Sequence, residues 1–397
     1  MSRLSLSVIA LCLSAQVGAA QSVPGSWKLP LIEGKLEGDW SDVLSPGGPA
    51  LHWSVTSTVS RPRERAISLI VDGPGVKIRA EATLDPLGNG AWDLREAELD
   101  LAQWWSLAAA LAGSNLEGIG AGGTLSANGA GMLLGGVPAG RLQLAWRNGR
   151  IDDLAHKVAI EGITAEVTFE DVAARRTAPA QTIAWTGGRY DLVELGAGRA
   201  LLALDGDQLR LEDVQAAVFG GEVRLSAVKV SVSRPEVEFT AQIFGVDAAL
   251  VLPLFPEVVT SASGRLDGSL SLRRDAEGVH LGAGRLTLPP GGTADVRLKP
   301  TPGLLTASLP ESVRKHYPGL ADLEAGRVPM RADLLEVAFD PAGDAEGRTA
   351  SVRLVGGPVD PRMRAPIDLN VNIRGPLETV VQFGTNSRLQ WGGGNKR

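Results

Sequence analysis

Most of this chain consists of short runs in which apolar and polar residues alternate, with glycine, proline or aspartate between one run and the next. In the clearest run, four apolar residues lie two apart and polar residues separate them: Val237, Phe239, Ala241 and Ile243. Successive side chains of a β-strand point to opposite faces, so this period places the apolar set on one face. The pattern predicts a sheet that is apolar on one side only.

The same alternation recurs along the chain and predicts a mainly β protein of many short strands. The strands are expected at residues 51–60, 66–72, 76–84, 91–101, 141–146, 158–170, 237–243, 328–340, 349–355 and 367–373. Further apolar residues join the one-sided set on these grounds: Val76, Ile78, Val223, Leu225, Ile367, Leu369, Val371 and Ile373.

Two segments favour helices. Residues 103–112 are good helix formers and Gly113 follows them. Residues 308–322 carry a capping pattern, with Ser308 as the expected N-cap, Pro310 in the first turn and Glu311 three residues after the cap, and Pro318-Gly319 is expected to end the helix. In the glycine-rich residues 118–136 we expect a turn at Gly118–Gly123 and then a glycine-led strand at residues 123–127, and the polar residues 173–181 are expected to form a loop.

An internal repeat with a constant offset of 147 residues divides the chain. It aligns Gly73 with Gly220, Val76 with Val223, Ile78 with Leu225 and Asp100 with Asp247. Two copies suggest a stack of modules, although two alternating sequences can also align by chance. We predict a signal peptide over 1–20, cap strands over 21–72, modules over 73–218 and 219–377, and a polar tail over 378–397.

The first 20 residues have the features of a secretory signal: Arg3, an apolar stretch and small residues near Ala20. An uncleaved inner-membrane anchor is the alternative. Cys12 is the only cysteine, so a cleaved chain would contain no thiol, disulfide or cysteine-ligated metal. These features favour the periplasm of a Gram-negative bacterium and association with the cell envelope.

Composition excludes one class of partner. The formal net charge is −6, and no basic excess is present that could follow a nucleic-acid backbone. We therefore expect no nucleic-acid partner.

No catalytic or cofactor motif in the chain is complete. Gly118, Gly120 and Gly123 fit G-x-G-x-x-G, but a dinucleotide site needs a strand before the glycines and a helix after them, the reverse of what is expected here. Ser312 and Lys315 fit S-x-x-K without its companion motifs. The four histidines form no metal-binding pair, and nine dispersed tryptophans favour packing over sugar stacking. We predict a non-enzyme with no cofactor, no metal and no catalytic residue.

The apolar faces allow two interpretations. They can meet in the closed core of a sandwich, which is the usual arrangement. Alternatively they can line an open groove that buries acyl chains, each methylene contributing about 0.8 kcal/mol.

Three motifs resemble the YdbH-like branch of the AsmA-like envelope proteins. They are Phe219-Gly220-Gly221-Glu222-Val223, Gly245-Val246-Asp247-Ala248-Ala249-Leu250, and Ser263-Gly264-Arg265-Leu266-Asp267-Gly268 with Gly284-Arg285-Leu286. The segment Pro366-Ile367-Asp368-Leu369-Asn370-Val371-Asn372-Ile373, followed by Gly375-Pro376-Leu377, resembles the family's final strand and its exit. The likeness is good over residues 214–377 and weak before them.

The resemblance implies an elongated, twisted, groove-forming antiparallel β-sheet stack with a few short helices, described as β-taco-like. It implies a periplasmic conduit that transports phospholipid between the inner and outer membranes, with acyl chains as ligands of the groove. It also implies a small outer-membrane lipoprotein as partner, pairing with the strand edge at Ile367–Ile373. Family members are generally longer and carry an N-terminal membrane anchor.

Two other hypotheses remain open. The protein could be a non-catalytic scaffold of the envelope with a closed core, contributing to outer-membrane integrity or assembly. It could also be a carbohydrate enzyme, which would require two carboxylates facing each other across a cleft.

Overall fold

The computed structural model describes residues 33–40, 50–105, 118–154, 157–190, 193–232, 236–251, 259–274, 279–307, 309–341, 343, 347–360 and 366–374. Over these ranges the fold is mainly β, with 22 strands in one antiparallel sheet and a few short helices. The mainly β, antiparallel class predicted from the alternation is therefore confirmed.

The first strands follow the predicted order closely. They are β1 (Gly34–Trp40), β2 (Leu51–Arg61), β3 (Glu64–Gly73), β4 (Val76–Leu84), β5 (Gly90–Asp100), β6 (Ile119–Leu134), β7 (Val137–Asp153), β8 (Val158–Asp171), β9 (Arg176–Thr177), β10 (Gln181–Trp185) and β11 (Gly187–Tyr190).

The later elements include three short helices. They are β12 (Val193–Asp205), β13 (Gln208–Val218), β14 (Gly221–Ser231), β15 (Val237–Asp247), α3 (Ala248–Val251), β16 (Val259–Ala262), β17 (Arg265–Arg274), β18 (Val279–Thr287), β19 (Ala294–Leu298), α4 (Glu311–His316), α5 (Gly319–Glu324), β20 (Met330–Phe339), β21 (Arg348–Pro358) and β22 (Ile367–Arg374).

The chain divides into two compact units. Unit 1 holds residues 1–191, 197–214 and 229–234, and unit 2 holds residues 192–196, 215–228 and 235–397. The module boundaries predicted from the repeat remain predictions.

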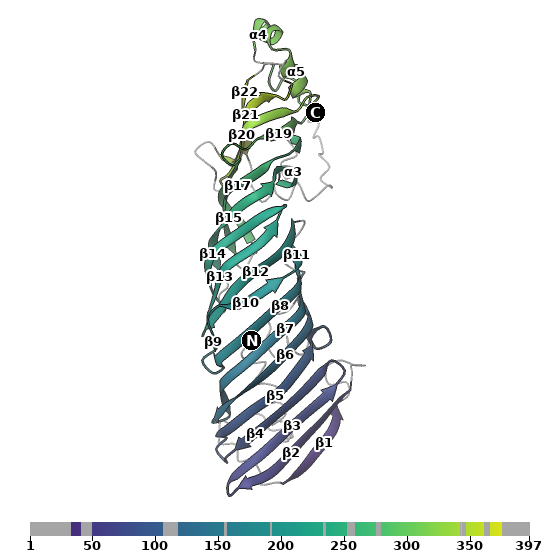
Figure 1. Cartoon of the computed structure of the whole chain (residues 1–397), viewed down its shortest axis with the longest axis vertical. Coiled ribbons are helices and arrows are strands. Elements are labelled where there is room, and N and C mark those ends of the chain that lie inside the picture. Colours follow the sequence, from purple (N-terminus) through teal and green to yellow (C-terminus); the bar gives the residue numbers. More distant parts are fainter. Residues whose placement is uncertain are drawn as a thin grey trace, which may run out of the picture. The chain divides into compact units, whose positions relative to one another are not determined.

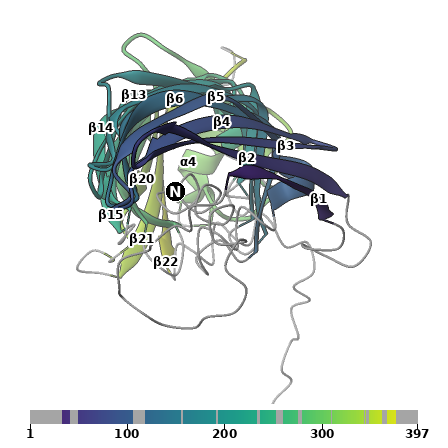
Figure 2. The same cartoon turned by 90° about the horizontal axis from the view of Figure 1, so that it is seen from below.

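In unit 1, neighbours in sequence are neighbours in the sheet. Each strand from β1 to β7 pairs antiparallel with the next, and β8 pairs with β9, β10 and β11 (Figure 1). Short turns join β2 to β3, β3 to β4, β4 to β5 and β6 to β7, as expected for hairpins. Viewed along the sheet, strands β3 to β6 follow a curve (Figure 2).

In unit 2 the sheet continues through β14, β15, β17, β18, β20, β21 and β22, again antiparallel. Two short strands depart from this order: β19 pairs with both β16 and β20. Because β16 and β19 lie outside the simple succession, they bring further apolar residues against the end of the sheet.

The strand expected at residues 123–127 is present but is longer at both ends, so the turn expected at Gly118–Gly123 is wrong. β6 runs from Ile119 to Leu134. At Gly131 an added Cβ would lie 2.0 Å from the carbonyl oxygen of Ala139, so only glycine permits this approach of β6 to β7. The glycines serve close backbone packing, which composition alone cannot distinguish from a turn.

Residues 308–322 contain two helices, and the predicted helix end at Pro318-Gly319 falls between them. Tyr317 and Pro318 separate α4 from α5. Proline lacks an N–H and crowds the preceding turn, so the helix restarts after it. Pro310 is the N-cap of α4 rather than a first-turn residue, and it makes no side-chain cap hydrogen bond. Ser308, the predicted cap, lies outside the described residues.

Residues 101–105 are helical, which agrees with the start of the helix predicted at 103–112. The rest of that segment, the signal peptide of residues 1–20 and the tail of residues 378–397 lie outside the described ranges.

Candidate functional site

The two faces of the unit 1 sheet differ sharply in chemistry. Residues paired across antiparallel strands point to the same side. One face carries apolar residues in register, including Val55 opposite Leu69, Leu69 opposite Ala80, and Ala80 opposite Leu94. The other face carries Thr56, Ser68 and Glu81 at the intervening positions of the same ladders.

A shallow groove with a cavity volume of about 50 Å³, partly open to solvent, lies over the apolar face of β2 to β6. Its apolar lining comprises Val55, Ile67, Leu69, Ala80, Ala82, Leu84, Trp92, Leu94 and Leu133. Several lining side chains are only half-buried, among them Ile67, Ala82 and Leu94.

Two clusters bound this groove at opposite ends of the strands. One contains Leu51, Leu69, Val71, Val76 and Trp104, and the other contains Leu84, Trp92, Leu133 and Leu142. The indole of Trp104 donates a hydrogen bond to the Pro74 carbonyl oxygen at 3.0 Å, and that of Trp92 to the Ala139 carbonyl oxygen at 3.1 Å. Their polar atoms are satisfied by backbone, so these rings act as packed walls, as expected for the tryptophans.

Of the predicted groove residues, Val76 and Ile78 lie in unit 1. Val76 is buried in the first of these clusters and Ile78 packs partly buried against it. Both lie on the same face of β4 as the lining residue Ala80, four and two residues before it. They therefore lie beside the groove lining, and their contact with lipid stays a prediction.

The predicted residues on β14 and β15 of unit 2 also share one face. Val223 pairs with Ile243, Phe239 pairs with Leu272, and Ala241 pairs with Leu270. Burial increases along β15. Val237 and Phe239 are half-buried, as is Leu225 on β14, whereas Ala241 and Ile243 are buried.

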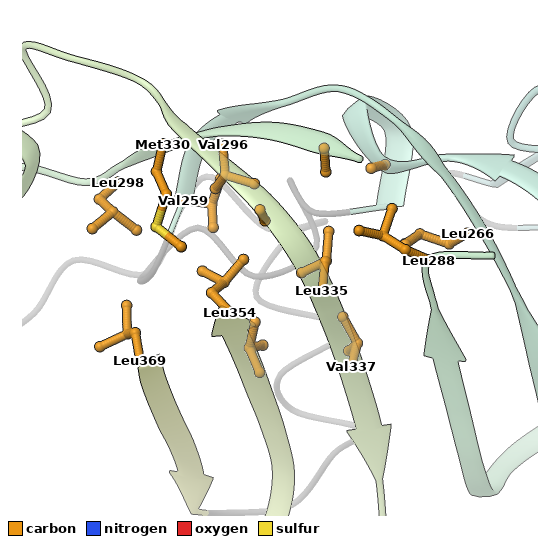
Figure 3. Close-up of a cluster of buried hydrophobic side chains, with 14 of the residues drawn as sticks. Val259, Leu266, Leu288, Val296, Leu298, Met330, Leu335, Val337, Leu354 and Leu369 are labelled. Atoms are coloured by element: carbon orange, nitrogen blue, oxygen red, sulfur yellow. The ribbon is translucent and has the colours of Figure 1, made fainter. Parts of the chain in front are cut away.

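The end of unit 2 is a closed core of protein side chains. Val296, Met330, Leu335, Val337, Val352 and Leu354 are fully buried, and Leu323 of α5 joins them. Figure 3 shows side chains of β16, β19, β20, β21 and β22 gathered in one cluster. Ile367 and Leu369 are buried in this core, and Val371 packs against it. Ile373 pairs with Ala350 through the backbone. At β20 to β22 the apolar face therefore contacts protein.

The motifs that resemble the envelope family converge on one corner of unit 2. The Arg265 guanidinium donates hydrogen bonds to the carbonyl oxygens of Gly220 and Gly245, at 2.7 and 2.9 Å. Asp267 accepts a hydrogen bond from the Gly245 amide at 2.6 Å, and the Asp247 amide donates to the Phe219 carbonyl oxygen at 2.8 Å. The motifs thus fix a turn and a bulge in the sheet, and they carry no reactive group.

The two aspartates of the internal repeat occupy equivalent positions. Asp100 ends β5 and its carboxylate accepts the Ala102 amide at 2.9 Å, and Asp247 ends β15 and accepts the Ala249 amide at 2.9 Å. In each case a short helix follows directly. An aspartate at this position is a helix N-cap.

Charges gather on the face opposite the apolar one. Lys77 pairs with Glu96 at 2.8 Å in unit 1, and Arg353 pairs with Asp368 at 2.8 Å in unit 2. The Arg353 hydrogen bond holds the pKa of Asp368 below its ordinary value. These side chains are exposed, so the pairs contribute little to stability and keep this face wet.

The candidate chemical motifs form no site. Gly120 and Gly123 lie within β6, and Lys315 pairs along the surface of α4 with Glu311 at 2.9 Å. No cluster of three or more histidine, cysteine or acidic side chains suited to a metal occurs in the described part of the chain. Within the same residues, no helix is long and apolar enough to span a membrane.

Most of the groove lining was missed by sequence reasoning. The residues on β2, β3, β5 and β6 obey the same period of two, for example Ile67 and Leu69, or Trp92 and Leu94. The signal was present in those strands. Local alternation does not say which strands stay uncovered, so it could not single them out.

One family model matches the chain, that of the YdbH-like proteins, described as intermembrane phospholipid transport protein YdbH, over residues 49–313. The match includes the first half, where the motifs are weak, and it stops before the Ile367–Ile373 strand. No curated protein and no solved structure matches significantly. Since the family model covers more than half of its residues, the chain belongs to the YdbH-like family of intermembrane phospholipid transport proteins.

Proposed function

We propose that this protein is a periplasmic lipid conduit, in which phospholipid acyl chains are buried on the apolar face of the sheet while headgroups stay in water. The observation that carries the proposal is the open groove of β2 to β6, with its apolar lining and its charged reverse face. The family description supports the substrate class.

Burial of an acyl chain supplies enough free energy for binding without any reactive group. About ten methylenes removed from water contribute about 8 kcal/mol, before the cost of ordering the chain. No directional contact is needed, so the chain can move along the face. The role is non-catalytic and requires no cofactor.

Unit 2 also has an incompletely covered apolar surface, formed by the half-buried part of β15. Val237, Phe239, Leu270 and Leu272 are apolar, lie on one face and are incompletely covered. The buried residues farther along, such as Ala241, Ile243 and Leu369, belong to the protein core. We assign the lipid-binding role to the incompletely covered positions.

A small outer-membrane lipoprotein remains the proposed partner. β22 is the last strand of the described residues and pairs with β21. A partner strand added beyond β22 would use the main-chain hydrogen bonds of β-augmentation.

The envelope scaffold with a closed core is the second candidate. The fully buried cluster of unit 2 favours it for that part of the chain, because such packing leaves no room for a ligand. The open groove of unit 1 has no role in a scaffold.

Neighbouring alanines on opposite faces test the proposal. Ala82 lines the groove and pairs with Trp92, and Ala91 is exposed on the other face beside Trp92. We expect Ala82→Asp to reduce the phospholipid co-purified with the protein at least fivefold, because a charge would have to be buried with each acyl chain. Ala91→Asp should leave the amount unchanged. Mass spectrometry of extracted lipid measures both.

Circular dichroism separates the two candidate functions. A folded Ala82→Asp variant with less lipid supports the conduit. A folded variant that carries as much lipid as the unmodified protein contradicts the assigned groove. If Ala82→Asp unfolds the protein while Ala91→Asp does not, the face is a closed core and the scaffold stands.

A further inference from the structure

Four large apolar side chains stand exposed at two adjacent hairpin turns of unit 1. Leu87, in the turn between β4 and β5, is 73% exposed. At the turn between β6 and β7, Leu134 is 61% exposed, Met132 is 54% exposed and Val137 is 53% exposed. We call Leu87, Met132, Leu134 and Val137 the apolar tip. Contiguous exposed apolar residues of this kind mark binding surfaces more often than isolated ones do.

The two turns are held together by hydrogen bonds. The Gly135 amide donates to the Asn89 side-chain oxygen at 2.9 Å, and the Gly136 amide donates to the Gly88 carbonyl oxygen at 3.0 Å. Gly135 and Gly136 have φ of 58° and 81°, which favours glycine. The apolar tip is therefore a fixed platform, so binding would order few groups.

The apolar tip adjoins the end of the lipid groove. Leu133 lies between Met132 and Leu134 on β6 and is buried, and Leu84 is the last residue of β4 before the turn that bears Leu87. Both Leu84 and Leu133 line the groove. The platform consequently stands at one mouth of the groove.

A polar zone follows directly below the apolar tip on the outer face. A hollow there is lined by Asp93, Arg95, Asn128, Arg141 and Gln143. Arg141 pairs with Ala130, two residues before Met132, which places it about 7 Å lower along the strand. Asp93 and Arg95 are 3.8 Å apart and form an ion pair. Basic side chains at this depth fit the phosphates of a membrane surface, since interfacial elements bury about 5 to 10 Å.

Asp85 is the one charged residue of segments 85–89 and 132–137. Its carboxylate accepts hydrogen bonds from the amides of Leu87 and Asn89, both at 2.8 Å. The negative charge of Asp85 is thus stabilised by hydrogen bonds within its own turn.

We propose that the apolar tip inserts into the surface of a phospholipid bilayer and sets the groove mouth against it. Four aliphatic side chains are far fewer than the roughly 20 to 30 residues a side of a stable protein interface. They also lack the tryptophan, tyrosine and arginine that dominate such interfaces. Lipid as the occupant rests on the proposed function, whereas the exposed platform does not.

Flotation of the full-length protein with vesicles tests the proposal. The vesicles contain phosphatidylethanolamine with a minor share of phosphatidylglycerol. We expect the double variant Leu87→Asp/Leu134→Asp to partition at least about tenfold more weakly, because two apolar burials are lost. Leu87→Met/Leu134→Met should bind as the unmodified protein does.

A matched control comes from exposed apolar residues elsewhere in unit 1. Leu154 is 82% exposed and Val232 is 55% exposed. Leu154→Asp/Val232→Asp adds the same charge and should float normally. Equal losses in the two aspartate variants, or normal flotation of the tip variant, would overturn the proposal.

Loading of lipid from detergent micelles separates this proposal from the groove. If the tip variant loads lipid normally but does not float, it has lost membrane binding through the apolar tip while the groove still binds lipid. If the unmodified protein floats but never loads, the groove assignment fails while the tip proposal stands.

Discussion

At the scale of single residues, Glu324 shows how a buried charge can organise a loop. Its carboxylate accepts hydrogen bonds from the amides of Leu305 and Thr306, at 3.0 and 3.1 Å, and from the Thr306 hydroxyl at 2.7 Å. Burial alone would raise the pKa of Glu324, but these hydrogen bonds outweigh it and the pKa is lowered. The charged form is therefore the one that holds the loop against α5.

The sign of that pKa shift predicts a loss of stability in acid. A carboxylate with a lowered folded-state pKa stabilises the fold above its unfolded pKa of about 4.3 and loses that contribution as pH falls through the folded pKa. We expect the protection of the Leu305 and Thr306 amides, taken relative to their intrinsic exchange rates at each pH, to fall as the pH drops through the lowered folded-state pKa of Glu324. Glu324→Gln should show fast exchange at neutral pH already, and hydrogen exchange with mass spectrometry measures it.

Glu311 supplies the control for Glu324. It is an exposed carboxylate on α4 that pairs with Lys315. Glu311→Gln should change the exchange of the loop little, because exposed ion pairs contribute at most about 1 kcal/mol. Equal effects of the two substitutions would show that the buried carboxylate has no special role.

At the scale of elements, the period of two was enough to predict most strands. β4 has the predicted bounds, and β22 differs by one residue. β6 is longer than the strand expected at residues 123–127, because its glycines pack backbone against backbone. The helix expected to end at Pro318-Gly319 corresponds to α4, and α5, which follows this break, was not predicted as a separate helix. Alternation indicates which face of a strand is apolar, but it does not indicate where two backbones pack closely.

The candidate site was predictable only as a face. Phe239 and Leu369 obey the same alternation, yet the first is half-buried and the second lies in the core. The difference arises from β16, β19 and α5, which come from other parts of the chain and cover Leu369. A local sequence pattern cannot predict which distant segments of the chain cover an apolar face. Val371→Asp, an obvious groove substitution by sequence, would therefore disturb a core contact.

The repeated aspartates lead to a prediction for the elements that they cap. Asp100→Ala and Asp247→Ala should each destabilise the protein by about 1 kcal/mol, the usual loss for a helix N-cap. Exchange should accelerate locally, at residues 101–105 in the first variant and 248–251 in the second. Urea unfolding and hydrogen exchange measure the two effects.

Glu98 on β5 serves as the reference for that experiment. It is exposed and lies on the same strand as Asp100. Glu98→Ala should be close to neutral. If the aspartate variants are as stable as Glu98→Ala, the two N-cap aspartates contribute nothing measurable to the stability of the protein.

At the scale of the whole molecule, each unit has a core of its own. Unit 2 contains the large cluster around Val352 and Leu354, and unit 1 contains the two smaller clusters around Trp104 and Trp92. Eight of the nine tryptophans precede residue 186 and so belong to unit 1. Tryptophan fluorescence therefore reports mainly on unit 1.

This division predicts that the units unfold separately. Val352 is fully buried, so Val352→Asp places a charge in the core of unit 2 at a cost of several kcal/mol. We expect far-UV circular dichroism to lose part of its strand signal while the tryptophan emission keeps its native midpoint in urea. Ser351→Asp, next in sequence and on the opposite face of β21, should change neither signal. Simultaneous loss of both signals would mean that the units unfold together.

The gradient of burial along β15 limits how far an acyl chain could move along this face in the proposed conduit. An acyl chain that moves along the half-buried residues Val237 and Phe239 meets Val246 and Leu266, which are already packed by protein. Farther on, Val337 and Val352 leave no space at all. In the proposed conduit, lipid that advances in this direction therefore cannot be buried beyond β15 on this face of unit 2.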